Sequence, residues 1–326
     1  MKRPLLIIND HEKIEEVYKR SEEYLKNHND LQDEIATYLW AYYNVMDLVP
    51  QTVESFWSGH FFPFAESYYE LENSFELCKQ GFYRHSLFAL RCVLELSVIG
   101  LYFDKDDQAH IDVQRWLRSE DPTPYFRRSL KRLFGLEYFR QFNEKFSLQQ
   151  EIEEIWDLLC DYVHVRGYRY STTGQSRANF NRFNESSLLR YVELMKKVVK
   201  GIVTMMLLKY PLGMQNLPLW DKFGFNTPVG GFLDESSRPA VLVILDEDAK
   251  EVLQNISDND PNVNYIVRCE PTAHRLLPDR QRIVHLLNLW NRQRIVHFGV
   301  RLTDIACILP LGSRQQLRGG ISWATN

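Results

Sequence analysis

Apolar residues recur every three to four positions through most of the first 210 residues, which is the spacing of helices with one buried face. Prolines and glycines interrupt this pattern, most clearly at Pro50, Gly81 and Pro211. The stretch 82–103 is apolar nearly all round, so we expect it at the centre of a helical bundle. The pattern predicts helices over 11–29, 31–48, 64–80, 82–103, 109–119, 123–134, 149–164 and 185–209.

The pattern changes after residue 210. Residues 211–238 are rich in glycine and proline and are expected to form a linker. Beyond them, 240–245 and 264–268 are predicted as strands, with a short helix over 247–256 between them. We therefore expect a mainly α protein with a smaller C-terminal α/β region. Its predicted parts are an N-terminal helical region (1–54), a helical bundle (55–210), the linker (211–238) and a small basic α/β region (239–326).

Composition agrees with a folded protein, since 44% of the 326 residues are hydrophobic and 25% are charged. At roughly 100–200 residues per domain, this length predicts two domains. Five cysteines without a CxxC pair favour reduced thiols in a cytosolic protein, with no metal site. No signal peptide is recognised, and no apolar stretch approaches the roughly 20 residues of a membrane span. We expect a cytoplasmic protein with no cofactor and no membrane partner.

Several catalytic signatures do not occur in the sequence. It contains no GxxxxGK[ST], GxGxxG, HExxH or GxSxG motif. These absences disfavour a P-loop ATPase, a dinucleotide-binding enzyme, a zinc protease of the HExxH type and an α/β-hydrolase.

Charge is distributed unevenly along the chain. Residues 266–326 carry nine arginines, no lysine and three acidic residues, which gives this segment +6 within a net charge of −4. Such asymmetry can mark a surface for nucleic acid or an acidic partner. The alternative is that this basic end pairs with the acidic helices of the same chain.

Three charged residues interrupt the most apolar helix. Arg84, Arg91 and Glu95 fall at i, i+7 and i+11, so they lie along one stripe. Unpaired charge in an apolar environment costs several kcal/mol. The interpretations are a buried Arg91–Glu95 pair that fixes helix register, or a polar pocket between helices.

His164 ends the amphipathic helix predicted over 149–164 and lies off its apolar stripe. One role is a cation at the helix C-terminus, which contributes about 0.3–1 kcal/mol. The other is proton transfer or hydrogen bonding, because histidine titrates near neutral pH.

The loop that follows His164 combines arginines with aromatic residues and contains no acidic residue. Arginine binds phosphates, and aromatic rings stack on unpaired bases. The sequence therefore predicts nucleic-acid binding here, although such loops also dock onto acidic helices of the same chain. The predicted binding residues of the loop are Arg166, Tyr168, Arg169, Tyr170, Arg177 and Arg182.

A six-residue segment, Arg-Gln-Arg-Ile-Val-His, occurs twice, at 280–285 and 292–297. An offset of twelve residues turns a helix by about 120°, so two copies on one helix would face different ways. A β-hairpin or two separate short elements fits equally well. From the second copy, Arg292 and Arg294 are added to the predicted nucleic-acid-binding residues.

The segments 84–96 and 156–167, Arg-His-Ser-Leu-Phe-Ala-Leu-Arg-Cys-Val-Leu-Glu-Leu and Trp-Asp-Leu-Leu-Cys-Asp-Tyr-Val-His-Val-Arg-Gly, resemble bacterial HEPN-like helical proteins. The resemblance covers about 55–210. It implies a bundle that often dimerises, a place in a defence system and, in active members, metal-independent ribonuclease activity through an Arg-x4–6-His motif. Here Asp157, Leu158 and Leu159 stand where that arginine is expected before His164.

Two functions follow from this resemblance and the basic loop. The first is a non-catalytic sensor or scaffold subunit of a defence complex. Its partners would be nucleic acid, RNA rather than DNA, or an acidic protein, besides a second copy or other subunits of the complex. The alternative is a ribonuclease effector with Arg91, Glu95 and His164 as the catalytic residues. In that case His164 would be the general acid or base, and Arg91 would stabilise the charge on phosphorus.

Overall fold

The computed structural model describes residues 11–49, 59–104, 109–176, 182–216, 233 and 235–268. Within these ranges the chain forms helices and turns but no strand, so the prediction of a mainly α protein is confirmed. The α-helices are α1 (His11–Lys26), α2 (Asn29–Val45), α4 (Phe62–Lys79), α5 (Tyr83–Phe103), α6 (Ala109–Leu117), α7 (Phe126–Leu133), α8 (Glu137–Phe146), α9 (Leu148–Val163), α10 (Thr172–Ser176), α11 (Glu185–Lys209), α13 (Ser237–Leu242), α14 (Glu247–Asn259) and α15 (Pro261–Arg268). The 3-10 helices are η1 (Met46–Leu48), η2 (Tyr168–Tyr170) and η3 (Pro211–Met214).

The helices predicted from apolar spacing between residues 11 and 209 are confirmed, with boundaries that differ by a few residues. α7 begins at Phe126 instead of residue 123, because a residue that precedes proline is disfavoured in helical conformation and Thr123 precedes Pro124. α8 is a helix that the apolar pattern does not single out. It buries Phe139 and Phe142 and exposes most of its charged residues.

The two predicted strands are wrong. Residues 240–245 fall in α13 and the turn after it, and 264–268 fall in α15. Short apolar runs do not distinguish a strand from a buried helix segment. Local signals favour helix in the second case, since Pro261 occupies the first helical position and the Asp260 carboxylate accepts a hydrogen bond from the Val263 amide at 2.8 Å.

Contacts divide the chain after Cys269 into two compact units, and all described residues belong to the first. The remainder of the predicted α/β region, with both Arg-Gln-Arg-Ile-Val-His copies, lies outside the described residues. So does most of the predicted linker. The predicted domain boundaries stay a prediction.

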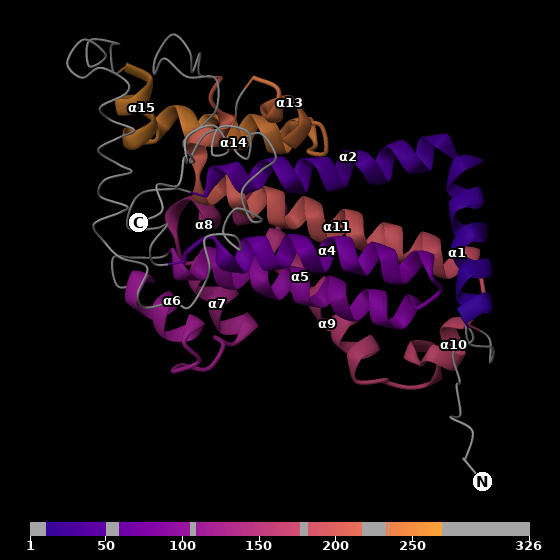
Figure 1. Ribbon diagram of the computed structural model, residues 1–326. Helices are drawn as coiled ribbons and strands as arrows, with labels where there is room; N and C mark the ends of the chain where they lie inside the picture. The colour runs from indigo at the N-terminus through magenta and orange to yellow at the C-terminus, as the bar shows by residue number, and fades with distance from the viewer. Residues whose placement is uncertain are drawn as a thin grey trace, which may run out of the picture. The chain divides into compact units, whose positions relative to one another are not determined.

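α5 occupies the centre of the bundle, as its apolar sequence predicts. It packs against α4, α11, α9 and α7, and α2 lies along α11 (Figure 1). Hydrogen bonds between buried hydroxyls join these helices. The Tyr42 hydroxyl of α2 contacts Ser67 of α4 at 2.5 Å and Ser97 of α5 at 2.8 Å. Tyr191 of α11 contacts Ser74 of α4 at 2.6 Å in the same way. These pairs satisfy polar groups that burial would otherwise leave at a cost of about 1–3 kcal/mol each.

By length and composition, α5 is the described helix that would also suit a membrane span. Its mean hydropathy over the most apolar window is 1.7, and 67% of that window is buried inside the protein. The central helix of a bundle has the same composition, so packing within this bundle accounts for the apolar character of α5.

Candidate functional site

α9 positions the candidate site because one of its faces is buried and the other is open. Leu148, Ile152, Ile155 and Leu159 point into the bundle at helical spacing. The opposite face presents Asp157, Cys160, Asp161 and His164, the residues at its C-terminal half that could act on a ligand.

Arg84 holds the C-terminal end of α9 in place. Its Nε donates to the Tyr162 carbonyl at 2.8 Å, and its Nη2 donates to the Val163 carbonyl at 2.9 Å. Its guanidinium also lies 4.3 Å from the centre of the Phe88 ring, and burial lowers its pKa. Arg84 therefore provides the positive charge at the end of this helix, a role that the sequence had offered to His164.

Arg91 and Glu95 form the predicted ion pair, with 2.6 Å between Nη2 of Arg91 and Oε1 of Glu95. The same carboxylate oxygen accepts a hydrogen bond from Nε1 of Trp156 at 3.1 Å, which ties α5 to α9. Both side chains of the ion pair are about three-quarters buried. This geometry favours the interpretation of a pair that fixes the register between two helices.

The environment of Cys160 links Arg91 to the open face of α9. Burial raises the pKa of the Cys160 thiol, and the charge and hydrogen bond of Arg91 act in the opposite direction. No hydrogen bond joins His164 to Arg91 or Glu95 among the described residues. The predicted catalytic role of these three residues stays a prediction.

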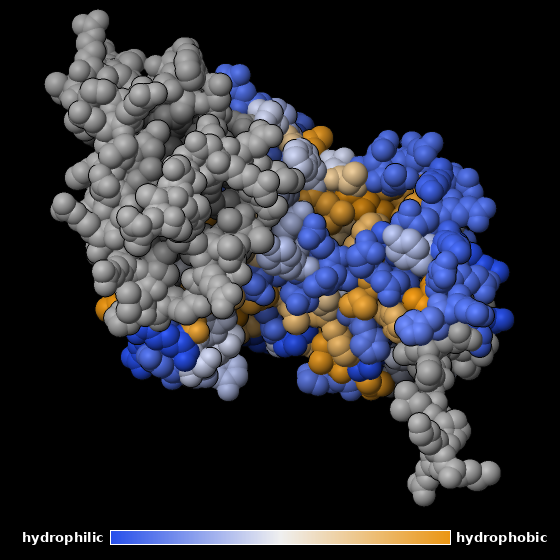
Figure 2. All heavy atoms as spheres, viewed as in Figure 1, coloured by the Kyte–Doolittle hydropathy of each residue, from blue (hydrophilic) through white to orange (hydrophobic). Residues whose placement is uncertain are grey.

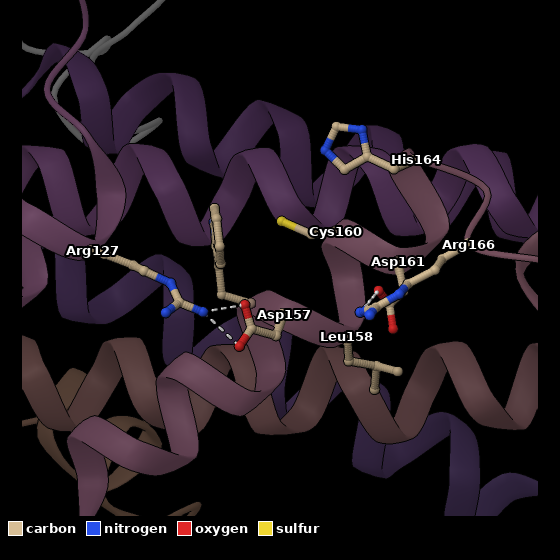
Figure 3. A pocket seen from close by; sticks show the side chains of 8 residues that line it. Arg127, Asp157, Leu158, Cys160, Asp161, His164 and Arg166 are labelled. Carbon is tan, nitrogen blue, oxygen red and sulfur yellow. Dashed lines mark hydrogen bonds and ion pairs between the residues drawn. The ribbon is translucent and has the colours of Figure 1, made fainter.

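The open face of α9 lines a groove of about 680 Å³. Figure 3 shows an ion pair on each side of Cys160, with His164 at the end of α9 on the side of Arg166. On one side a guanidinium nitrogen of Arg127 lies 2.6 and 2.7 Å from the two carboxylate oxygens of Asp157. On the other, Arg166 lies 3.3 Å from Asp161. Both arginines and Asp157 are solvent-exposed, and Asp161 is partly buried, so each pair contributes only about 0–1 kcal/mol and an incoming anion can compete for the arginines.

The helix beside the groove, α7, is strongly basic on its exposed face. Its buried residues are apolar or small, and Phe126 stacks on Trp156 with ring centres 5.0 Å apart. This stacking joins α7 to α9. The exposed residues of α7 are Arg127, Arg128, Lys131 and Arg132.

Sequence reasoning missed α7 as a candidate binding element. The signal was present, because the sequence Phe-Arg-Arg-Ser-Leu-Lys-Arg-Leu places basic residues at i, i+1, i+4 and i+5 and apolar residues on the other face. Tyr125 precedes the helix and is 82% exposed. An exposed ring beside four cations is the same combination of residues that predicts nucleic-acid binding in the loop after His164.

That loop divides into exposed and docked residues. Tyr168 is 69% exposed, and Arg166 and Arg169 are also exposed. Tyr170 instead packs edge-on against Tyr162, with ring centres 5.0 Å apart, and joins the edge of the core.

Three of the predicted nucleic-acid-binding residues lie outside the described residues: Arg177, Arg292 and Arg294. Arg182 is described and exposed. Among the described binding residues that the sequence predicts, Tyr170 is the one whose ring packs against another ring of the bundle, that of Tyr162.

No group of three or more His, Cys, Asp or Glu residues in the described ranges is arranged to hold a metal ion. The thiols of Cys78, Cys92 and Cys160 are free.

Comparison with known proteins adds no assignment. No family model, no curated protein and no solved structure matches this chain. The HEPN-like resemblance therefore stays a prediction, and the chemistry of the surface carries the functional argument.

Proposed function

We propose that this protein is a non-catalytic module that binds single-stranded nucleic acid through the surface formed by α7, the α9 groove and η2. The observation that carries the proposal is the basic face of α7 next to a groove with an arginine on each side. α7 contacts α9, and α9 contacts η2, so the basic residues belong to one continuous region. RNA as the nucleic acid, and a place in a defence complex, are extensions that come from the resemblance.

The charges in this region suit a phosphate backbone. Arg128 and Lys131 have no ion pair among the described residues, and the exposed Arg127 and Arg166 each pair with one aspartate, of which Asp157 is exposed and Asp161 is partly buried. Phosphates neutralised by such residues release counterions, so binding should weaken steeply with salt. Tyr125 and Tyr168 provide exposed rings, and stacking contributes about 1–3 kcal/mol per base. An exposed ring beside a cation favours single strands, whose bases are free to stack.

The test is a salt titration of binding to a fluorescein-labelled 20-nucleotide RNA without secondary structure, followed by anisotropy. One variant replaces Arg128, Lys131 and Arg169 with alanine. A control variant replaces Lys13, Lys19 and Arg20 of α1, which are equally exposed and remove the same charge. If three phosphate contacts are lost, the slope of log K against log salt should fall by about 2, from roughly 0.7 per phosphate.

The control variant should keep the wild-type slope, because α1 is not part of the proposed surface. Equal losses in both variants would mean that overall charge, and not this surface, governs binding. Wild-type slopes in both variants would remove the proposal altogether.

A ribonuclease is the second candidate function, and the position of His164 favours it. The exposed imidazole lines the same groove as Arg127 and Arg166, so an acid–base group and two cations share one cavity. These arginines are better placed for a substrate phosphate than Arg91, which Glu95 and Trp156 engage. Labelled RNA incubated with wild type and His164→Ala, with and without EDTA, tests it. Cleavage that resists EDTA and is lost in the variant would replace the binding-only proposal.

A further inference from the structure

A row of four aromatic rings crosses from α2 to α4, on helices that the proposed function does not use. Trp40 and Tyr43 stack with ring centres 5.3 Å apart, and Tyr43 lies 5.5 Å from Tyr68. Tyr69 extends the row, 6.3 Å from Tyr68. Trp40 is 57% exposed and Tyr69 is 41% exposed. We call these four residues the aromatic row.

The aromatic row is held on a rigid support. Tyr42, next to Tyr43 in the chain, is fully buried and hydrogen-bonded to both α4 and α5. Its ring also lies parallel to that of Tyr68 at 6.5 Å. The two helices are therefore fixed relative to each other where the row crosses, and little ordering of the rings is needed when a partner binds.

The surroundings of the aromatic row are acidic. α4 carries four glutamates and a single cation, Lys79, which is buried and paired with Glu22 and Glu76. α2 carries three acidic residues and no lysine or arginine, and one of the three, Glu34, pairs with Lys196 of α11. In the view of Figure 2, the described surface over α1, α2 and α4 is mostly hydrophilic, interrupted by patches of hydrophobic residues.

Three glutamates of α4, Glu66, Glu70 and Glu72, form no ion pair with another described residue. Glu70 is partly desolvated and lies near Glu66, and both effects raise its pKa. Burial and, after it, the neighbouring Glu72 carboxylate raise the pKa of Tyr68. A cation placed over this face would relieve the repulsion between Glu66 and Glu70.

We infer that the aromatic row and its flanking glutamates form a docking surface for an arginine-rich segment of a partner protein. A guanidinium stacks flat on Trp and Tyr rings and forms two parallel hydrogen bonds with a carboxylate. Exposed rings between carboxylates offer both contacts at once. Lysine makes a weaker contact with the rings, since its compact ammonium does not stack.

Other occupants fit this face less well. Nucleic acid would bring phosphates to the carboxylates of α2 and α4, although bases can stack on such rings. An anionic membrane would meet the same repulsion. The charges thus separate two surfaces on the bundle: a basic one around α7 and α9, and an acidic aromatic one on α2 and α4.

The test measures binding of a fluorescein-labelled peptide of five Gly-Arg repeats to the full chain, with a Gly-Lys peptide of equal length for comparison. The variant Trp40→Ala with Tyr69→Ala should weaken binding of the arginine peptide about tenfold, from the roughly three- to fivefold that each exposed cation–π contact provides. The wild-type preference for arginine over lysine should disappear in this variant. Trp40→Phe with Tyr69→Phe keeps both rings and should retain most of that preference.

A charge control separates docking from general attraction. Glu66, Glu70 and Glu72 changed to Gln should weaken the arginine peptide, whereas Glu15, Glu16 and Glu23 of α1 changed to Gln should not. Equal weakening by the two triple variants would overturn the inference, as would equal affinity for the two peptides. The single-stranded RNA probe should bind the Trp40→Ala, Tyr69→Ala variant as tightly as wild type. Loss of RNA binding in it would make the row a base-stacking surface and overturn the inference, while leaving nucleic-acid binding intact.

Discussion

Replacement of Arg84 should destabilise the protein, because Arg84 binds two backbone carbonyls at the C-terminal end of α9. Arg84→Met keeps most of the aliphatic stem over Phe88 but removes both hydrogen bonds to the carbonyls of Tyr162 and Val163. Hydrogen bonds from a charged donor contribute about 1.5–3 kcal/mol each when well buried. Because Arg84 is only partly buried, we expect a total loss of about 2–3 kcal/mol.

Two measurements check this expectation. Urea unfolding followed by far-UV circular dichroism should show the lower free energy of unfolding. Hydrogen exchange measured by mass spectrometry should show faster exchange in 160–167, the segment that carries His164 and Arg166. Arg84→Lys should lie between wild type and Arg84→Met, because an ammonium keeps the charge but does not present the paired donors of a guanidinium.

Arg115→Met is the matched control, since Arg115 is exposed and paired only with Asp121, and its replacement should cost less than about 0.5 kcal/mol. If Arg84→Met is as stable as this control and exchange in 160–167 does not change, then Arg84 does not hold the end of α9. The groove would in that case depend on the packing of α9 alone.

Three further outcomes follow from the buried and partly buried groups. Tyr42→Phe should lower the free energy of unfolding by about 1–3 kcal/mol, because the two buried hydrogen bonds of Tyr42 with Ser67 and Ser97 are lost, while each serine keeps its bond to a backbone carbonyl; an unchanged urea midpoint would contradict this. Glu70→Gln should stabilise the protein at pH 7. The raised folded-state pKa means that Glu70 favours folding below its ordinary pKa of 4.5 and opposes it above, so the gain should vanish in urea titrations as pH falls below that value. Arg91→Met should raise the pKa of Cys160 further and slow its alkylation by iodoacetamide, read at the peptide level by mass spectrometry; faster alkylation at unchanged stability would contradict the proximity of the two groups.

The sequence by itself determined most of the helices and the position of α5. Apolar spacing is a local property, so residues three and four apart report the buried face of a helix before its neighbours are known. The pairing of Arg91 with Glu95 is local for the same reason, because residues four apart on a helix are neighbours. The basic face of α7 could also have been recognised from its eight residues.

The tertiary structure decided which distant residues meet. Arg84 and the end of α9 are 78 residues apart in the chain, and no periodicity indicates that a guanidinium there reaches two carbonyls. The groove likewise needs α7 beside α9, which places Arg127 against Asp157. Tyr170, which the sequence predicts as a binding residue, packs edge-on against Tyr162 at the edge of the core, a contact between residues of η2 and α9.

The two wrongly predicted strands, 240–245 and 264–268, show where a local sequence pattern does not determine the secondary structure. Apolar runs of five or six residues satisfy the requirements of a strand and of a buried helical turn equally, so the neighbouring elements decide between them. Val241 is buried in α13, which packs along α2, and no described strand is present there to pair with a strand at 240–245. A strand needs a hydrogen-bonding partner from elsewhere in the chain, whereas a helix satisfies its own backbone, and only the folded chain shows which of the two is available.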